Sequence, residues 1–509
     1  MSDPRLSPLA PDVDEVDEVD VKKDVDHIEK SIELADPRTA ALQAEADWIR
    51  SLTPEEFDQH QKKLLRKIDL RLLPTLFILL ILNYLDRNAL ASARVQGIEK
   101  DLGMKGNDFN VAISILFAGY ILGQVPSNLI LSRVRPSIYL SGFVALWGQS
   151  ALAQPRPTTL RTWSSFGFSS ALPSRPTSPA RYFCFLLGTP RKSSHCGLPL
   201  SVLKAMSRTS SELTGAGVQG GMDGLAGIAS WRWLFILEGA ITVAAAIAAA
   251  FILPDYPATT KWLNDKEKAI AIYRLEKDTG VKDDDTMTLF QSFKTAVVDY
   301  KLWLLAMIIV TKTTAGAVTQ FIPTVVNTFG MNKVTTLLLT APPYLVAAVL
   351  ALTISWSSDR RPERCYHLLA PIVFGMVGFI IAATTKATAP RYFSLFLMVG
   401  GLFGSYNVAL AWISSTFPRP RAKRAAAYAT INSLGNIAQI WSPYLYDSSF
   451  GPSYTIAFVT NTIMSAVAVL FCLILRWCLA RENRKMEREE AEQTEMSQEG
   501  ASMRIRYVL

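Results

Sequence analysis

The apolar residues of this chain are gathered into long blocks and are not spaced with the period of an amphipathic helix. A block of about 20 apolar residues can cross the hydrocarbon core of a bilayer as one helix. The pattern therefore predicts an all-α, polytopic membrane protein. The expected spans are about 72–92, 110–131, 137–147, 231–253, 302–325, 335–356, 368–384, 392–417, 425–446 and 454–477.

Charged segments divide these blocks into two halves. Two halves of about six helices joined by a charged linker are typical of a transporter whose halves rock around a site at the membrane midplane. No signal peptide is expected at the acidic N-terminus. The predicted organisation is a disordered cytosolic tail (1–64), a first membrane half (65–253), a cytosolic linker (254–300), a second membrane half (301–478) and a cytosolic tail (479–509).

Basic residues in the short loops fix the expected orientation. Arg133 and Arg135 follow the second span, and Asp359 and Arg360 follow the equivalent span of the second half. Loops rich in Lys and Arg stay on the cytosolic side, so both termini are expected in the cytosol. We expect these four residues to contribute to an inner gate or to fix topology, and the protein to be a monomer in the plasma membrane.

Composition excludes several other functions. The net charge of +8 lies in short runs between apolar blocks, which argues against nucleic-acid binding. The five cysteines and four histidines lack the spacing of a metal site or a disulfide framework. No cofactor is expected, and no intramembrane constellation of His, Ser or Cys suggests an enzyme.

The first span carries polar groups at a depth where they are costly. Asn83, Asp86 and Arg87 lie within the block Leu72–Ser92, and an ionisable group there costs about 2.5 kcal/mol or more. Asp86 lies roughly 21 Å along the helix axis from Leu72. Asp86 and Arg87 either serve transport or simply pair with each other or cap the helix end.

Two motifs carry a resemblance to a known family. They are Asn83-Tyr84-Leu85-Asp86-Arg87-Asn88 and the run from Gly119 to Leu129. They resemble the fungal allantoate permease family, the anion:cation symporters of the major facilitator superfamily. Further similarity covers Trp231–Gly239 and Asn432–Tyr446. The resemblance implies that Asp86 binds the coupling proton and that Arg87 holds a substrate carboxylate, for which its planar fork is suited.

One region departs from this family. From about residue 149 to residue 214 the chain is rich in Ser, Pro, Arg and Thr, which is not the composition of a bilayer span. Ser codons of the TCN type and the Phe codons TTY both begin with T, and a shifted frame that places this T in the middle of a codon encodes only Phe, Leu, Ile, Met or Val. We therefore hypothesise a frame error or false exon that removes the fourth helix and part of the fifth. The alternative is a genuine inserted loop.

The second half contributes further candidates. Lys312 lies near the expected midplane of its span, where a lysine cannot easily reach either interface and can attract an anion. The uncharged polar residues are individually more typical of helix–helix hydrogen bonds, but together they indicate a polar cavity. Glu238 is expected to pair with Arg232. With Asn83, the additional substrate-binding candidates are Gln320, Tyr406, Asn407 and Asn436.

These observations predict a secondary active transporter that imports a small organic anion by proton symport. An allantoate-, nicotinate- or pantothenate-like carboxylate is the cargo that the resemblance implies. The expected partners are this anion, protons and the lipid bilayer. The alternative function is a membrane sensor or an inactive carrier, because the fourth helix is missing from the expected fold.

Overall fold

The computed structural model describes residues 48, 52–131, 134–153, 200–253, 260, 263–271, 289–361, 363–417, 421–496 and 508. The chain forms two compact units. The first comprises 1–74, 180–193 and 252–282, and the second comprises 75–179, 194–251 and 283–509. Within the first unit, the Lys67 ammonium pairs with the Glu267 carboxylate at 2.7 Å.

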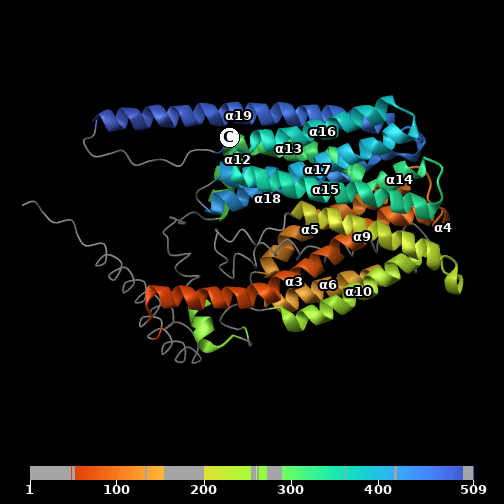
Figure 1. The fold of residues 1–509 in the computed structure, drawn as a ribbon, viewed down its shortest axis with the longest axis horizontal. Helices are drawn as coiled ribbons and strands as arrows, with labels where there is room; N and C mark the ends of the chain where they lie inside the picture. The colour runs from red at the N-terminus through yellow and green to blue at the C-terminus, as the bar shows by residue number, and fades with distance from the viewer. Residues whose placement is uncertain are drawn as a thin grey trace, which may run out of the picture. The chain divides into compact units, whose positions relative to one another are not determined.

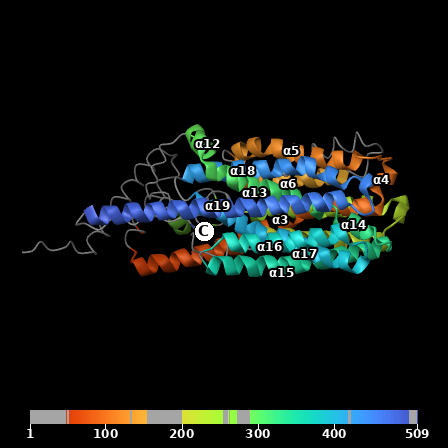
Figure 2. The same ribbon diagram turned by 90° about the horizontal axis from the view of Figure 1, so that it is seen from above.

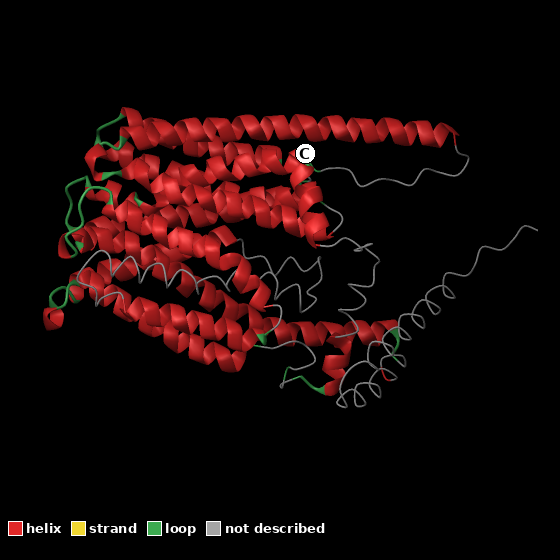
Figure 3. Ribbon diagram, turned by 180° about the vertical axis from the view of Figure 1, so that it is seen from behind, coloured by secondary structure: helices red, strands yellow, loops and turns green. Residues whose placement is uncertain are grey.

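All regular secondary structure in the described ranges is helical (Figures 1 and 3), which confirms the all-α prediction. The elements are α3 (Pro54–Gln96), α4 (Ile98–Asp101), α5 (Asp108–Leu131), α6 (Pro136–Ala153), α9 (Leu200–Gly221), η3 (Leu225–Gly227), α10 (Ser230–Ile252), α12 (Leu289–Val298), α13 (Tyr300–Gly316), η4 (Ala317–Gln320), α14 (Ile322–Asn327), α15 (Lys333–Arg360), α16 (Cys365–Thr384), α17 (Thr388–Thr416), α18 (Arg421–Trp441), η5 (Ser442–Tyr446), η6 (Ser448–Phe450) and α19 (Thr455–Met496).

In the part of the chain that the structure describes, seven helices are long and apolar enough to cross a membrane. They are α3, α10, α13 with η4, α15, α16, α17 and α19. Large apolar side chains such as Leu345, Val349, Ile463 and Leu470 are exposed on them. Outward-facing apolar side chains suit lipid, and the helix satisfies its own backbone polar groups there.

The start of α3 is set by its own sequence. The Glu56 N–H donates to the Thr53 hydroxyl at 3.4 Å, and the Thr53 N–H donates to the Glu56 carboxylate at 3.1 Å. This reciprocal pair is a capping box, and Pro54 occupies the first helical position, where no N–H is needed. The helix thus begins inside the tail predicted to be disordered (1–64), so that prediction does not hold from residue 54 onward.

Helix α9 corrects the prediction for the anomalous region. The break was expected to extend to about residue 214, but residues 200–221 form one helix that packs against α15 and α17. Its amphipathic sequence is too polar for a helix that faces lipid on all sides. The bundle nevertheless buries its polar face, which carries Arg208 and Glu212. The remainder of the anomaly, residues 154–199, lies outside the described residues.

Helices of the two sequence halves meet within the second unit. α9 of the first half packs on α15, and α5 packs on α18, as Figure 2 illustrates for the neighbouring α5 and α18. The expected span 302–325 is broken into α13, η4 and α14. The Tyr344 hydroxyl donates to the Thr319 carbonyl oxygen at 2.9 Å, which satisfies one backbone group freed by the break.

Helices α16 and α17 approach closely through glycine. A Cβ atom added to Gly401 would lie 2.7 Å from the Gly375 backbone nitrogen and would also collide with the Pro371 carbonyl oxygen. We expect Gly401→Ala to lower the free energy of unfolding by about 1–3 kcal/mol, because the backbones must separate. Gly142→Ala is the control, since its Cβ would meet nothing within 4 Å. Equal melting temperatures for the two purified variants would contradict this prediction.

Candidate functional site

Asp86 lies at the meeting point of three helices in the first half. Its side chain is 5% exposed. The Trp147 indole N–H of α6 donates to its carboxylate at 2.7 Å, and the Thr242 hydroxyl of α10 donates at 3.2 Å. Two neutral side chains, one from α6 and one from α10, thus hold this buried carboxylate in place.

A second carboxylate lies one turn before Thr242 on α10. Glu238 is 1% exposed, and neither carboxylate oxygen has a hydrogen-bond partner among the described residues. It interacts electrostatically with Asp86 and Glu212. The expected pairing with Arg232 is therefore wrong, and the Arg232 guanidinium lies over the Trp231 ring, 4.9 Å from its centroid.

Helix α9 supplies a third carboxylate and a cation that the sequence analysis missed. Glu212 is fully buried and accepts a hydrogen bond from the Ser92 hydroxyl of α3 at 3.0 Å. Arg208, one turn earlier, is 6% exposed and interacts with Glu212 electrostatically. An Arg and a Glu four residues apart share one helix face, and this spacing is the signal that could have revealed them.

The turn between α9 and α10 positions Glu212 and Glu238 relative to each other. The Ser230 N–H donates to the Asp223 carboxylate at 3.1 Å, and the Gln219 amide donates to it at 3.0 Å. These hydrogen bonds, led by the one from the Ser230 backbone, hold the pKa of Asp223 below its usual value. The charged form of Asp223 thus fixes the start of α10.

Cations gather around Tyr406 of α17. The Lys204 ammonium of α9 lies 3.9 Å from the Tyr406 ring centroid, and the Lys312 ammonium of α13 lies 4.8 Å from it. Lys204 also lies 5.6 Å from the centroid of the Tyr84 ring on α3. Aromatic faces attract cations through the ring quadrupole, so the tyrosines position both ammonium groups. Lys204 and Tyr84 were not among the sequence candidates.

Lys312 is buried, at 7% exposed, as its position in the sequence predicts. Its ammonium donates to the Leu402 carbonyl oxygen at 3.1 Å. It lines a small cavity whose other walls are mostly apolar, with the Ser405 and Ser465 side chains as the polar exceptions. The lysine therefore places a positive charge in largely apolar surroundings, which is costly without an anion.

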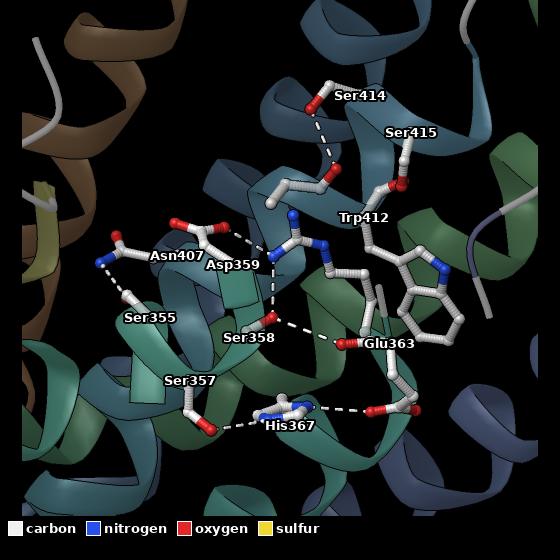
Figure 4. Close-up of polar contacts among 12 residues, drawn as sticks. Ser355, Ser357, Ser358, Asp359, Glu363, His367, Asn407, Trp412, Ser414 and Ser415 are labelled. Atoms are coloured by element: carbon white, nitrogen blue, oxygen red, sulfur yellow. Dashed lines mark hydrogen bonds and ion pairs between the residues drawn. The ribbon is translucent and has the colours of Figure 1, made fainter. Parts of the chain in front are cut away.

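The remaining substrate-binding candidates are distributed over several helices. Asn83 is buried in α3, and the Asn407 amide of α17 donates to the Ser355 hydroxyl of α15 at 3.1 Å, as Figure 4 shows. Gln320 and Asn436 are half-buried in η4 and α18. The Asn407 contact is the helix–helix hydrogen bond that the sequence favoured. The side chain of Arg87 lies outside the described residues.

The gate candidates lie at helix ends. Arg135 is exposed just before α6, and Asp359 and Arg360 are exposed at the end of α15. The Arg364 guanidinium donates to the Ser358 hydroxyl at 2.7 Å and pairs with Asp359 at 2.9 Å (Figure 4). Arg133 lies outside the described residues.

A second contact set in the same region links α16 to α19. Glu363 contacts the His367 ring at 2.9 Å, and this ring also contacts the Ser357 hydroxyl at 3.1 Å (Figure 4). Glu363 also pairs with Arg476 of α19 at 3.1 Å. These contacts connect the end of α15 and the start of α16 to α19.

The fold and these buried charges define a multi-pass helical membrane protein. Residues 76–443 match the family model of the Major Facilitator Superfamily. The chain belongs to the Major Facilitator Superfamily. It is therefore a membrane transporter that moves a small-molecule substrate, and it is not an enzyme.

Individual relatives agree with this assignment. The MFS-type transporter cnsO of Penicillium expansum is 29% identical over 446 residues, which cover 84% of each chain. A putative tartrate transporter of Agrobacterium vitis is 26% identical over 429 residues, covering 84% of this chain and 93% of the relative. The partially occluded, inward-open xylose transporter XylE of E. coli superposes with a TM-score of 0.60 at 13% identity, covering 80% of this chain and 97% of that chain. The last match shows that the fold is shared.

Proposed function

We propose that this transporter imports a small organic anion together with protons. The observation that carries the proposal is that one helical bundle buries both kinds of charge that this task needs. Three carboxylates, Asp86, Glu212 and Glu238, lie in the first half, and Lys312 lies in the second. Buried ionisable groups in membrane helices are costly and mark ion and substrate pathways.

Similarity supports the choice of cargo. The motif around Asp86 and Arg87 resembles the allantoate permeases, which are anion:cation symporters. The Agrobacterium relative is described as a putative tartrate transporter, and tartrate is a carboxylate. An allantoate-, nicotinate- or pantothenate-like carboxylate therefore remains the proposed class.

Each candidate receives a role in this proposal. Asp86 exchanges the coupling proton, because its carboxylate is buried in the first span and is held there by two neutral hydrogen-bond donors. Lys312 supplies affinity for the anion, and the gate residues control access from the cytosolic side. The substrate is bound by Arg87, Asn83, Lys312, Gln320, Tyr406, Asn407 and Asn436, and the inner gate includes Arg133, Arg135, Asp359 and Arg360.

The cellular setting follows the same reasoning. The proposed protein is a monomer in the plasma membrane with both termini in the cytosol. Lys62, Lys63 and Arg66 precede the first span, and Arg481 and Arg484 follow the apolar part of α19. Basic residues next to a span stay on the cytosolic side.

The purified full-length chain in proteoliposomes tests this function. An inwardly directed proton gradient is expected to drive accumulation of radiolabelled small carboxylates above equilibrium, because proton entry supplies the free energy. A protonophore should collapse the accumulation. Uptake that only equilibrates the cargo, with or without the gradient, would contradict proton coupling.

A further inference from the structure

Two lysines from different halves of the chain converge on one aromatic ring. Lys204 belongs to α9 of the first half, and Lys312 belongs to α13 of the second half. Their ammonium groups lie 3.9 and 4.8 Å from the centroid of the Tyr406 ring. The two nitrogen atoms therefore lie no farther apart than the sum of these two distances, and two ammonium groups at such a separation repel each other.

Among the described residues, no acid compensates this pair of charges. Neither lysine forms an ion pair with a residue that the structure describes. Their contacts there are the rings of Tyr84 and Tyr406 and the Leu402 carbonyl oxygen. Lys312 is buried and Lys204 is half-buried, and these contacts place no negative charge beside either ammonium group.

The three buried carboxylates do not neutralise these two lysines in the structure. Asp86 accepts hydrogen bonds from Trp147 and Thr242, and Glu212 accepts one from Ser92. The contacts of these two carboxylates thus lie within the first half. The lysine pair is left for a ligand that enters the bundle.

We propose that Lys204 and Lys312 form a binding site for a dianion, with one carboxylate of a short dicarboxylate held by each lysine. This inference rests on the proposed import of an organic anion with protons, and it favours dicarboxylates over monocarboxylates such as allantoate, nicotinate and pantothenate. A monocarboxylate would neutralise one ammonium group and leave the other without a negative charge beside it. A dicarboxylate neutralises both and replaces their mutual repulsion with two charge-assisted hydrogen bonds.

The position of the two lysines gives the dianion a second effect. Because one lysine comes from each half, the bound dianion connects α9 to α13. Its carboxylates therefore favour an arrangement in which both halves contact the cargo. Lys204 is the specificity residue that this arrangement adds to the sequence candidates.

Direct binding of matched ligands to the full-length protein tests the proposal. The probes are succinate and glutarate with their monoamides, succinamate and glutaramate, measured by calorimetry in detergent at neutral pH. Each pair differs in one charge and little in size. We expect the wild type to bind each diacid about tenfold or more tightly than its monoamide, since hydrogen bonds between charged groups are stronger than those of a neutral amide.

Variants assign the preference to the lysines. Lys204→Met and Lys312→Met should each reduce the ratio of diacid to monoamide affinity to about one, while Lys204→Arg should retain the preference. Lys105→Met, which removes an exposed lysine in the loop before α5, is the control and should keep the wild-type ratio. Elution volume and melting temperature identify any variant that fails to fold. If Lys204→Met is such a variant, the ratio of diacid to monoamide affinity in Lys204→Arg, which keeps the positive charge, tests the role of that charge.

The outcomes separate the two proposals. Equal affinity of the wild type for diacid and monoamide, with proton-driven uptake intact, would overturn the dianion site and leave the proposed function standing. A preference that survives Lys204→Met would overturn the assignment to Lys204. If the wild type neither binds nor accumulates any carboxylate, both proposals fail.

Discussion

Asp86→Asn is expected to abolish proton-driven accumulation of the anion while exchange of labelled for unlabelled anion continues. The amide keeps the size of the side chain and can still accept hydrogen bonds from Trp147 and Thr242, but it cannot bind and release a proton. Coupling should therefore be lost although the anion can still cross. Uphill uptake and counterflow in the same proteoliposomes measure the two activities separately.

A matched control exists in the same chain. The Asp101 carboxylate accepts a hydrogen bond from the Trp231 indole at 2.7 Å, the same type and length of contact as that between Asp86 and Trp147. Asp101 is exposed at the end of α4, so Asp101→Asn should leave coupling unchanged. If uphill uptake is normal in Asp86→Asn, Asp86 has no coupling role, and Glu212 or Glu238 takes its place.

Arg208→Leu is expected to lower the free energy of unfolding by about 1–3 kcal/mol, because the buried Glu212 side chain loses the positive charge that stabilises it. Glu212 is fully buried, and Arg208 is the cation that interacts with it on the same helix face. Chemical unfolding of the purified protein in detergent measures this loss. It should be accompanied by a clear fall in melting temperature.

The double variant Arg208→Leu, Glu212→Leu should recover much of that loss, because it removes the orphaned carboxylate as well. Arg135→Leu makes the same substitution at an exposed position and should change stability little. A double variant that is less stable than Arg208→Leu alone would show that the two side chains do not act as a pair.

Several features could be predicted from the sequence. The blocks of apolar residues gave the all-helical membrane fold, because hydrocarbon leaves a helix few alternatives. The cost of polar groups in such blocks also identified Asp86 and Lys312, and both are buried in the structure. Their roles in transport remain predictions. The sequence assigned each of these residues to a helix, but it could not identify the side chains of other helices that lie next to them.

The sequence-based predictions were wrong where a segment was judged by its composition, without the helices that pack against it. Residues 200–214 are too polar for a span facing lipid on all sides, so the sequence argued against a helix there. In the structure, α9 packs against α15 and α17, and the bundle covers the polar face that carries Arg208 and Glu212. For Glu238, sequence proximity suggested Arg232, but the two side chains do not pair.

The sequence by itself determined that the chain forms membrane helices and that charges lie inside them, because both properties depend on the solvent around a single helix. Only the tertiary structure decided which charges meet. It brought the ammonium groups of Lys204 and Lys312 close to the same Tyr406 ring, and it placed Glu238 near Asp86 and Glu212. Electrostatic energy depends on distances between helices, and these distances are set by packing rather than by position along the chain.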